Sequence, residues 1–144
     1  RMVMEYEIGN MAEGNRYMEG LVETLRLVTS GPRYDHASAA LMIPIVARIT
    51  GTADRLRTAE EAAATVLSAT SATPFITRYA SWGLALIAVI RGDAHLAQEY
   101  YPALQSSAGT QLDGLSGDRV LGLVAQTIGE QERASQHYEN ALAF

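Results

Sequence analysis

Three histidines, His36, His95 and His137, are the side chains of this sequence best suited to proton transfer or metal binding near neutral pH. Each falls in a different predicted helix. No two of them stand at the His-x-x-x-His or His-Glu-x-x-His spacing that places two ligands on one helical face. We therefore expect all three to be surface polar groups, and the sequence predicts no catalytic residue and no metal site.

Other residue types that carry catalysis or hold cofactors are missing. The sequence has no cysteine, and all 11 of its Lys and Arg residues are arginine, which excludes a thiolate, a Schiff-base lysine and a P-loop lysine. Acidic pairs such as Glu60 and Glu61 fall in early turns of predicted helices, where carboxylates interact favourably with the helix dipole. We therefore expect no cofactor and no enzymatic activity.

Composition narrows the class of protein further. The net charge of −5 disfavours direct nucleic-acid binding, which depends on neutralising phosphates. The longest apolar run, 82–90, is too short to span a bilayer, so we expect no membrane contact. The lack of cysteine fits a reducing cytoplasm. A length of 144 residues predicts a single domain over 1–144, and the first residue, which is not methionine, predicts a fragment of a longer multidomain protein.

Apolar periodicity divides the chain into about seven helices. The run 39–47 is apolar on nearly every face and predicts a central buried helix, kinked at Pro44. Residues 2–9 extend the first helix or stay outside it, and 108–115 forms the longest loop. The predicted helices cover 10–30, 35–50, 54–70, 74–91, 93–107, 116–129 and 130–144.

Capping residues set these boundaries. A capping box from Thr58 to Glu61 would start the third helix near 59, whereas the apolar period favours a start near 54. Ser30-Gly31-Pro32 ends the first helix, and Pro102 predicts a bend or an early end of the fifth. The predicted N-caps are Asp35, Thr73, Asp93 and Ser116, and the turn glycines are Gly51, Gly92 and Gly129.

The last turn, at Gly129, has small residues on both sides: Gly122 before it, then Ala134 and Ala141 with Tyr138 between them. Small residues let helices approach closely, and the aromatic ring fills the gap between neighbouring hairpins. This pattern resembles a tetratricopeptide repeat, although the turn glycines stand 41 and 37 residues apart, more than the 34 of that repeat. The resemblance implies an all-α, right-handed array of antiparallel hairpins at about 35–70, 74–107 and 116–144.

Residues 74–144 also resemble the helical C-terminal arrays of large bacterial signalling ATPases. These regulators join a nucleotide-cyclase-like or DNA-binding output domain to an ATPase domain, and they include LuxR-type transcriptional activators. The likeness rests on the segments 86–93, 97–104, 117–125 and 134–142. It implies a non-catalytic interaction or sensor module of such a regulator.

The tetratricopeptide resemblance also implies a binding groove, because the first helix of each hairpin lines the concave face of such an array. The apolar run after Trp82 favours a core position for that side chain, and the arginines would suit an acidic or phosphorylated partner. The residues placed near the groove are Arg48, Tyr79, Trp82, Arg119 and Gln126.

We therefore expect a module that binds a protein or peptide partner, or a neighbouring domain of the same chain. The alternative is a small-molecule effector site lined by Trp82, Tyr79 and an arginine. An enzyme ranks third, and a simple spacer is a further interpretation. Apolar residues at the chain end, Tyr138, Leu142 and Phe144, predict self-association through the C-terminal helix or cover by a following repeat.

Overall fold

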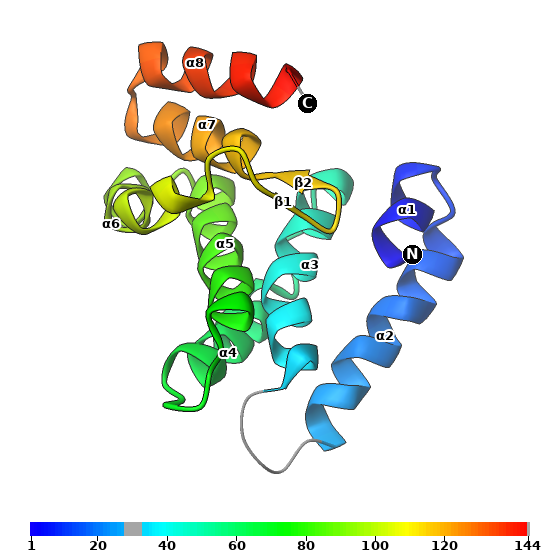
Figure 1. The fold of residues 1–144 in the computed structure, drawn as a ribbon. Coiled ribbons are helices and arrows are strands. Elements are labelled where there is room, and N and C mark those ends of the chain that lie inside the picture. The colour runs from blue at the N-terminus through cyan, green and yellow to red at the C-terminus, as the bar shows by residue number, and fades with distance from the viewer. Residues whose placement is uncertain (28–32, 144) are drawn as a thin grey trace. The chain divides into compact units, whose positions relative to one another are not determined.

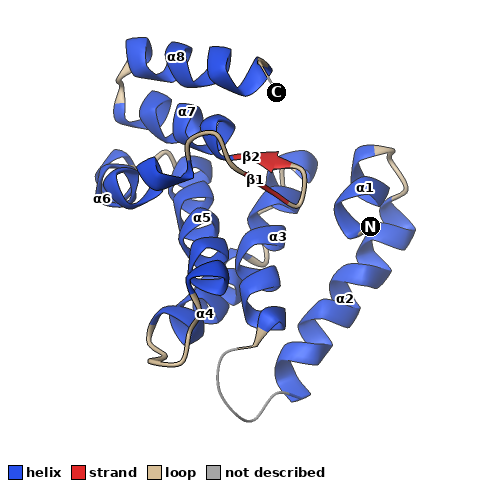
Figure 2. Ribbon diagram, in the orientation of Figure 1, coloured by secondary structure: helices blue, strands red, loops and turns tan. Residues whose placement is uncertain are grey.

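The structure, a computed structural model, describes residues 1–27 and 33–143. Within these ranges the regular elements are helices apart from one hairpin of two-residue strands, which confirms the all-α class (Figures 1 and 2). Contacts divide the chain into two compact units, Arg1–Gly83 and Leu84–Phe144. The boundary falls inside helix α5 (Pro74–Arg91), whereas the length of the sequence predicts a single domain.

The first unit is organised around helix α3 (Tyr34–Thr50), which packs most extensively on α4 (Leu56–Leu67) and also contacts α1 (Met2–Glu7) and α2 (Met11–Leu27). The predicted apolar run explains this central position, because most of 39–47 is buried. The N-terminal half of α5 completes the unit.

A proline and a glycine allow α5 to lie close to α3. Pro44 has no N–H, so the carbonyl of Ala40 loses the hydrogen bond that it would accept in a regular helix. Gly83 of α5 approaches that carbonyl so closely that a Cβ on Gly83 would lie 1.9 Å from the Ala40 oxygen. Glycine is therefore required here by space.

The second unit contains the C-terminal half of α5, α6 (Ala94–Leu104), α7 (Gly117–Ile128) and α8 (Gln131–Leu142). Helix α7 packs on both α6 and α8. A 3₁₀ turn (Gln105–Ser107) and an antiparallel hairpin of β1 (Gln111–Leu112) and β2 (Leu115–Ser116) connect α6 to α7. Asp113 and Gly114 form the tip of this hairpin with φ of 47° and 81°, the backbone that a tight two-residue turn requires.

Several predicted helix ends are confirmed. The Leu96 N–H donates to Asp93 Oδ1 over 3.0 Å, and the Arg119 N–H donates to Ser116 Oγ over 3.5 Å. Helix α5 begins at Pro74 after Thr73, as predicted. In each case a short polar side chain stands beside N–H groups that have no partner inside the helix.

The start of α3 differs from the prediction. The N-cap is Arg33 and not Asp35, which lies in the first turn. The Arg33 N–H donates to His36 Nδ1 over 3.4 Å, so His36 supplies the capping acceptor. His36 is buried, which corrects its assignment as a surface group. Burial lowers its pKa and so favours the neutral ring that can accept this hydrogen bond.

Other boundaries shift by a few residues. Helix α4 begins at Leu56 with Arg55 as N-cap, between the two predicted starts, so Thr58 lies inside the helix. The described chain holds eight α-helices where about seven were predicted, because Gly9, with φ of 80°, separates α1 from α2. Helix α6 ends early, at Leu104, two residues after Pro102. The predicted stop at Ser30-Gly31-Pro32 lies outside the described residues.

Candidate functional site

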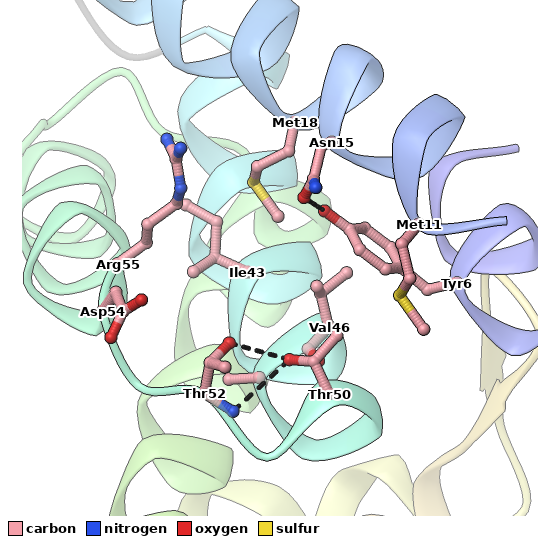
Figure 3. Close-up of a pocket in the computed structure, with 11 residues that line it drawn as sticks. Tyr6, Met11, Asn15, Met18, Ile43, Val46, Thr50, Thr52, Asp54 and Arg55 are labelled. Carbon is pink, nitrogen blue, oxygen red and sulfur yellow. Dashed lines mark hydrogen bonds between the residues drawn. The ribbon is translucent and has the colours of Figure 1, made fainter. Parts of the chain in front are cut away.

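A cleft in the first unit is the main candidate for a binding site. It lies between the α1–α2 hairpin on one side and α3 with the following turn on the other, and its volume is about 350 Å³. The side chains that line it are labelled in Figure 3, apart from Ala47. They are Tyr6, Met11, Asn15, Met18, Ile43, Val46, Ala47, Thr50, Thr52, Asp54 and Arg55.

Tyr6 shapes the side of the cleft formed by α1 and α2. Its ring packs on Gly14, where an added Cβ would lie 3.0 Å from three ring atoms. Its hydroxyl donates to Asn15 Oδ1 over 2.7 Å. Burial raises the pKa of Tyr6, so the hydroxyl keeps the proton that this bond needs. This contact joins the two helices and holds the ring against the cleft.

The opposite side comes from α3 and from the turn after it. Thr50 Oγ1 donates to the Val46 carbonyl over 2.9 Å and lies 2.8 Å from Thr52 Oγ1. Gly51 ends α3 in the left-handed conformation, with φ of 73°. Together these interactions turn the chain after α3, so that Thr52, Asp54 and Arg55 reach the rim of the cleft.

An ion pair connects the two sides. Arg55, at the start of α4, pairs with Glu19 of α2 through Nη2 and Oε1. Its neighbour Asp54 is exposed at the rim. Of the lining side chains, only Asp54 and Arg55 carry a charge at neutral pH, and no histidine is among them. The arrangement suits binding of an apolar group with polar edges.

In the second unit, a cluster of polar side chains joins three helices. Asp118 of α7 accepts the Gly109 N–H at Oδ2 over 2.7 Å, and its Oδ1 lies 2.9 Å from His137 Nδ1 in α8. His137 Nε2 lies 2.9 Å from the hydroxyl of Tyr101 in α6. With Asp118 ionised, His137 Nδ1 donates to the carboxylate and Nε2 accepts the Tyr101 proton. We call these three side chains the Asp-His-Tyr cluster.

The Asp-His-Tyr cluster has the order of groups found in catalytic triads: a carboxylate, an imidazole and a hydroxyl. Its environment argues for a structural role. Asp118 is 1% exposed and Tyr101 is 7% exposed, so the hydroxyl scarcely reaches solvent. Burial raises the pKa of Tyr101, which keeps the phenol protonated. The cluster therefore ties α6, α7 and the loop at Gly109 to α8.

Sequence reasoning missed this cluster. It placed His137 on the surface, whereas the structure brings that side chain to a buried carboxylate 19 positions earlier and a tyrosine 36 positions earlier. No local spacing motif connects residues so far apart. The one available signal was the position of His137 on the same helical face as Ala134, Tyr138 and Ala141.

The cluster leads to a pH-dependent expectation. Burial alone would raise the pKa of Asp118, but hydrogen bonds from Gly109, His137 and Asn140 outweigh that effect and hold the pKa below its usual value. The folded unit therefore binds this proton more weakly than the unfolded chain. Asp118 contributes stability above about pH 4, and this contribution is lost as the pH falls toward the folded-state pKa.

We expect the stability difference between wild type and Asp118→Asn to be largest near neutral pH and to shrink between about pH 5 and pH 3. Urea unfolding at a series of pH values measures it. Glu139→Gln, an exposed change in the same unit, should show little of this dependence. A difference that stayed constant down to pH 3 would contradict the proposed role of the Asp118 charge.

The predicted groove residues are divided between the two units. Arg48, Tyr79 and Trp82 belong to the first unit, and Arg119 and Gln126 to the second. Both arginines and Gln126 are exposed. Tyr79 is 1% exposed and Trp82 is fully buried, so neither side chain is placed to contact a ligand, and neither lines the cleft.

The predicted packing residues lie at the contact between α7 and α8. Tyr138 packs on Gly122, where an added Cβ would lie 2.5 Å from the ring. This places the ring inside one hairpin, whereas the sequence predicts a position between two hairpins. The Tyr138 hydroxyl donates to Gln126 Oε1 over 2.7 Å. Ala134 is buried and Ala141 is half-buried.

The surface of α8 bears on the predicted self-association. Leu142 is exposed, and Phe144 lies outside the described residues. Self-association through this helix stays a prediction, with Leu142 as the large apolar side chain that α8 exposes. The other exposed residues of α8 are polar or charged: Gln131, Glu132, Arg133, Ser135, Gln136, Glu139 and Asn140.

Comparison with known proteins finds no matching family, no matching curated protein and no matching solved structure. Among the residues that the structure describes, no helix has both the length and the apolar character needed to cross a bilayer. The same residues do not bring three or more His, Cys, Asp or Glu side chains together where they could hold a metal ion.

Proposed function

We propose that this chain is a non-catalytic helical interaction module and that it binds a protein or peptide partner in the cleft of its first unit. The observation that carries the proposal is the cleft itself, whose centre is formed by Met18, Ile43, Val46 and Ala47 and whose edges are polar. An apolar centre with a polar rim is the usual anatomy of a protein interface.

The open character of the cleft favours a protein segment over a small molecule. Met11, Asn15, Thr52 and Asp54 all line it and are all exposed, so the cleft is accessible along its rim. An enclosed pocket would instead surround most of a small ligand. The small-molecule alternative of the sequence analysis depended on Trp82 and Tyr79, which are buried elsewhere.

The side chains of the cleft suit an adaptable contact. Met11 and Met18 are flexible and polarizable, and such side chains can adjust to different apolar groups. The tetratricopeptide-like arrangement, and a place in a bacterial signalling or transcription regulator, stay predictions from the sequence resemblance. The proposed cleft does not depend on either of them.

A variant that fills the cleft tests the proposal. We expect Ala47→Leu to weaken binding of an amphipathic leucine–glutamine peptide by about tenfold, equivalent to about 1.4 kcal/mol, because the larger side chain occupies the space of the ligand. The readout is NMR titration of ¹³C-labelled methionine methyl groups. Met11 and Met18 line the cleft, whereas Met2, Met4 and Met42 do not and serve as internal references.

The matched control is Ala64→Leu, the same substitution at an exposed position of α4. It should bind the peptide as wild type does. Circular dichroism would establish that both variants remain folded. The absence of any peptide-dependent shift at Met11 and Met18 in wild type, or equal affinity of the two variants, would refute the cleft as the binding site.

A further inference from the structure

The charges at the rim of the cleft indicate what its partner carries. Two of the side chains that line the cleft are charged, Asp54 and Arg55. Arg55 is neutralised by its ion pair with Glu19. Among the described residues, the Asp54 carboxylate makes no hydrogen bond and no ion pair. The rim therefore has one carboxylate whose charge the chain itself does not balance.

This charge stands beside an apolar surface. Asp54 follows the turn at Gly51, and the cleft interior begins with Val46 and Ala47 in the preceding helix. A volume of about 350 Å³ is small for a binding pocket, so it holds a few side chains and not a whole helix. The segment that fits would insert apolar side chains and keep its backbone and polar groups at the rim.

We infer, on the basis of the proposed function, that the cleft receives the apolar side chains of a partner segment that places a lysine or arginine beside Asp54. In a helical partner, residues three or four positions apart share a face, so a basic residue one turn from the apolar ones satisfies this geometry. An acidic residue at the same place would meet the carboxylate of Asp54 and would have to compete with Glu19 for Arg55.

Two matched peptides test the inference. Both are amphipathic helices of leucine and glutamine, and they differ at one position on the edge of the apolar face, which is lysine in one and glutamate in the other. We expect the lysine peptide to shift the methyl signals of Met11 and Met18 with about two- to fivefold higher affinity, the effect of an exposed ion pair. The preference should decrease as salt is added.

Two variants assign the preference to Asp54. Asp54→Asn should bring the affinities for the two peptides within about twofold of each other, because it removes the carboxylate and keeps the size of the side chain. Glu7→Gln removes the same charge from an exposed position of α1 that does not line the cleft, and it should keep the preference. Comparison of these two variants distinguishes a local contact at Asp54 from the general attraction between an acidic chain and a basic peptide.

The outcomes distinguish this inference from the proposed function. If neither peptide shifts Met11 and Met18, the binding site itself is refuted. If both bind there with equal affinity, or if Asp54→Asn keeps the lysine preference, the cleft stands and the basic partner is refuted. If benzylammonium binds as tightly as the lysine peptide, the occupant of the cleft is a small amine, and the peptide partner is refuted.

Discussion

Replacing Gly83 with alanine is expected to lower the free energy of unfolding by about 3 kcal/mol, the upper end of the usual cost of overpacking. The new Cβ would lie 1.9 Å from the Ala40 oxygen and 2.5 Å from its carbonyl carbon. Both atoms belong to the backbone of α3, so no side-chain rotation can relieve the overlap and the two helices must separate. Urea unfolding followed by circular dichroism measures the change.

Gly20→Ala provides the matched control. Gly20 also lies inside a helix, α2, but an added Cβ there has no neighbour within 4 Å. Alanine at an open helical position should stabilise the chain by about 0.5–1 kcal/mol, since it restricts the unfolded chain more than glycine does. The same substitution should therefore have opposite signs at the two sites. A stable Gly83→Ala variant would mean that α3 and α5 do not pack as described.

The second large effect is expected for Asp118→Ala, at about 3 kcal/mol. Removing the carboxylate leaves the Gly109 N–H and His137 Nδ1 without their acceptor in a buried place, and each buried unpaired group costs about 1–3 kcal/mol. Asp118→Asn keeps one acceptor oxygen and should cost less. Thermal or urea unfolding measures both variants, and hydrogen exchange at Gly109 would report the loss of its acceptor directly.

Glu139→Ala removes a carboxylate from the exposed surface of α8 and should change stability by less than about 0.5 kcal/mol. Equal losses for Asp118→Ala and Glu139→Ala would mean that the Asp-His-Tyr cluster does not hold the second unit together. A larger loss for Asp118→Ala, together with unchanged exchange at Gly109, would assign the effect to a contact other than this hydrogen bond.

The candidate site was largely beyond sequence reasoning. The cleft combines residues 6–18 with residues 43–55, and residues 19–42 separate the two groups in the chain. Periodicity shows that Met18 and Val46 belong to apolar faces, but it does not show that those faces leave a space between them. The tetratricopeptide resemblance instead implied a groove near Tyr79 and Trp82, and the apolar run after Trp82 favoured a core position for that side chain. Burial decides between these alternatives.

The sequence by itself determined the class of the fold and most of its helix ends. The 3.6-residue apolar period and the caps at Thr73, Asp93 and Ser116 depend on neighbours in the chain, so they are visible without a structure.

Tertiary structure decided which glycines are packing sites and which polar groups are buried. Gly20 and Gly83 read alike in the sequence, yet only Gly83 faces a backbone carbonyl. Asp118 reads as a first-turn carboxylate and becomes a buried acceptor, because its partners come from residues 9 and 19 positions away. Such contacts depend on how the helices pack, which no local pattern specifies.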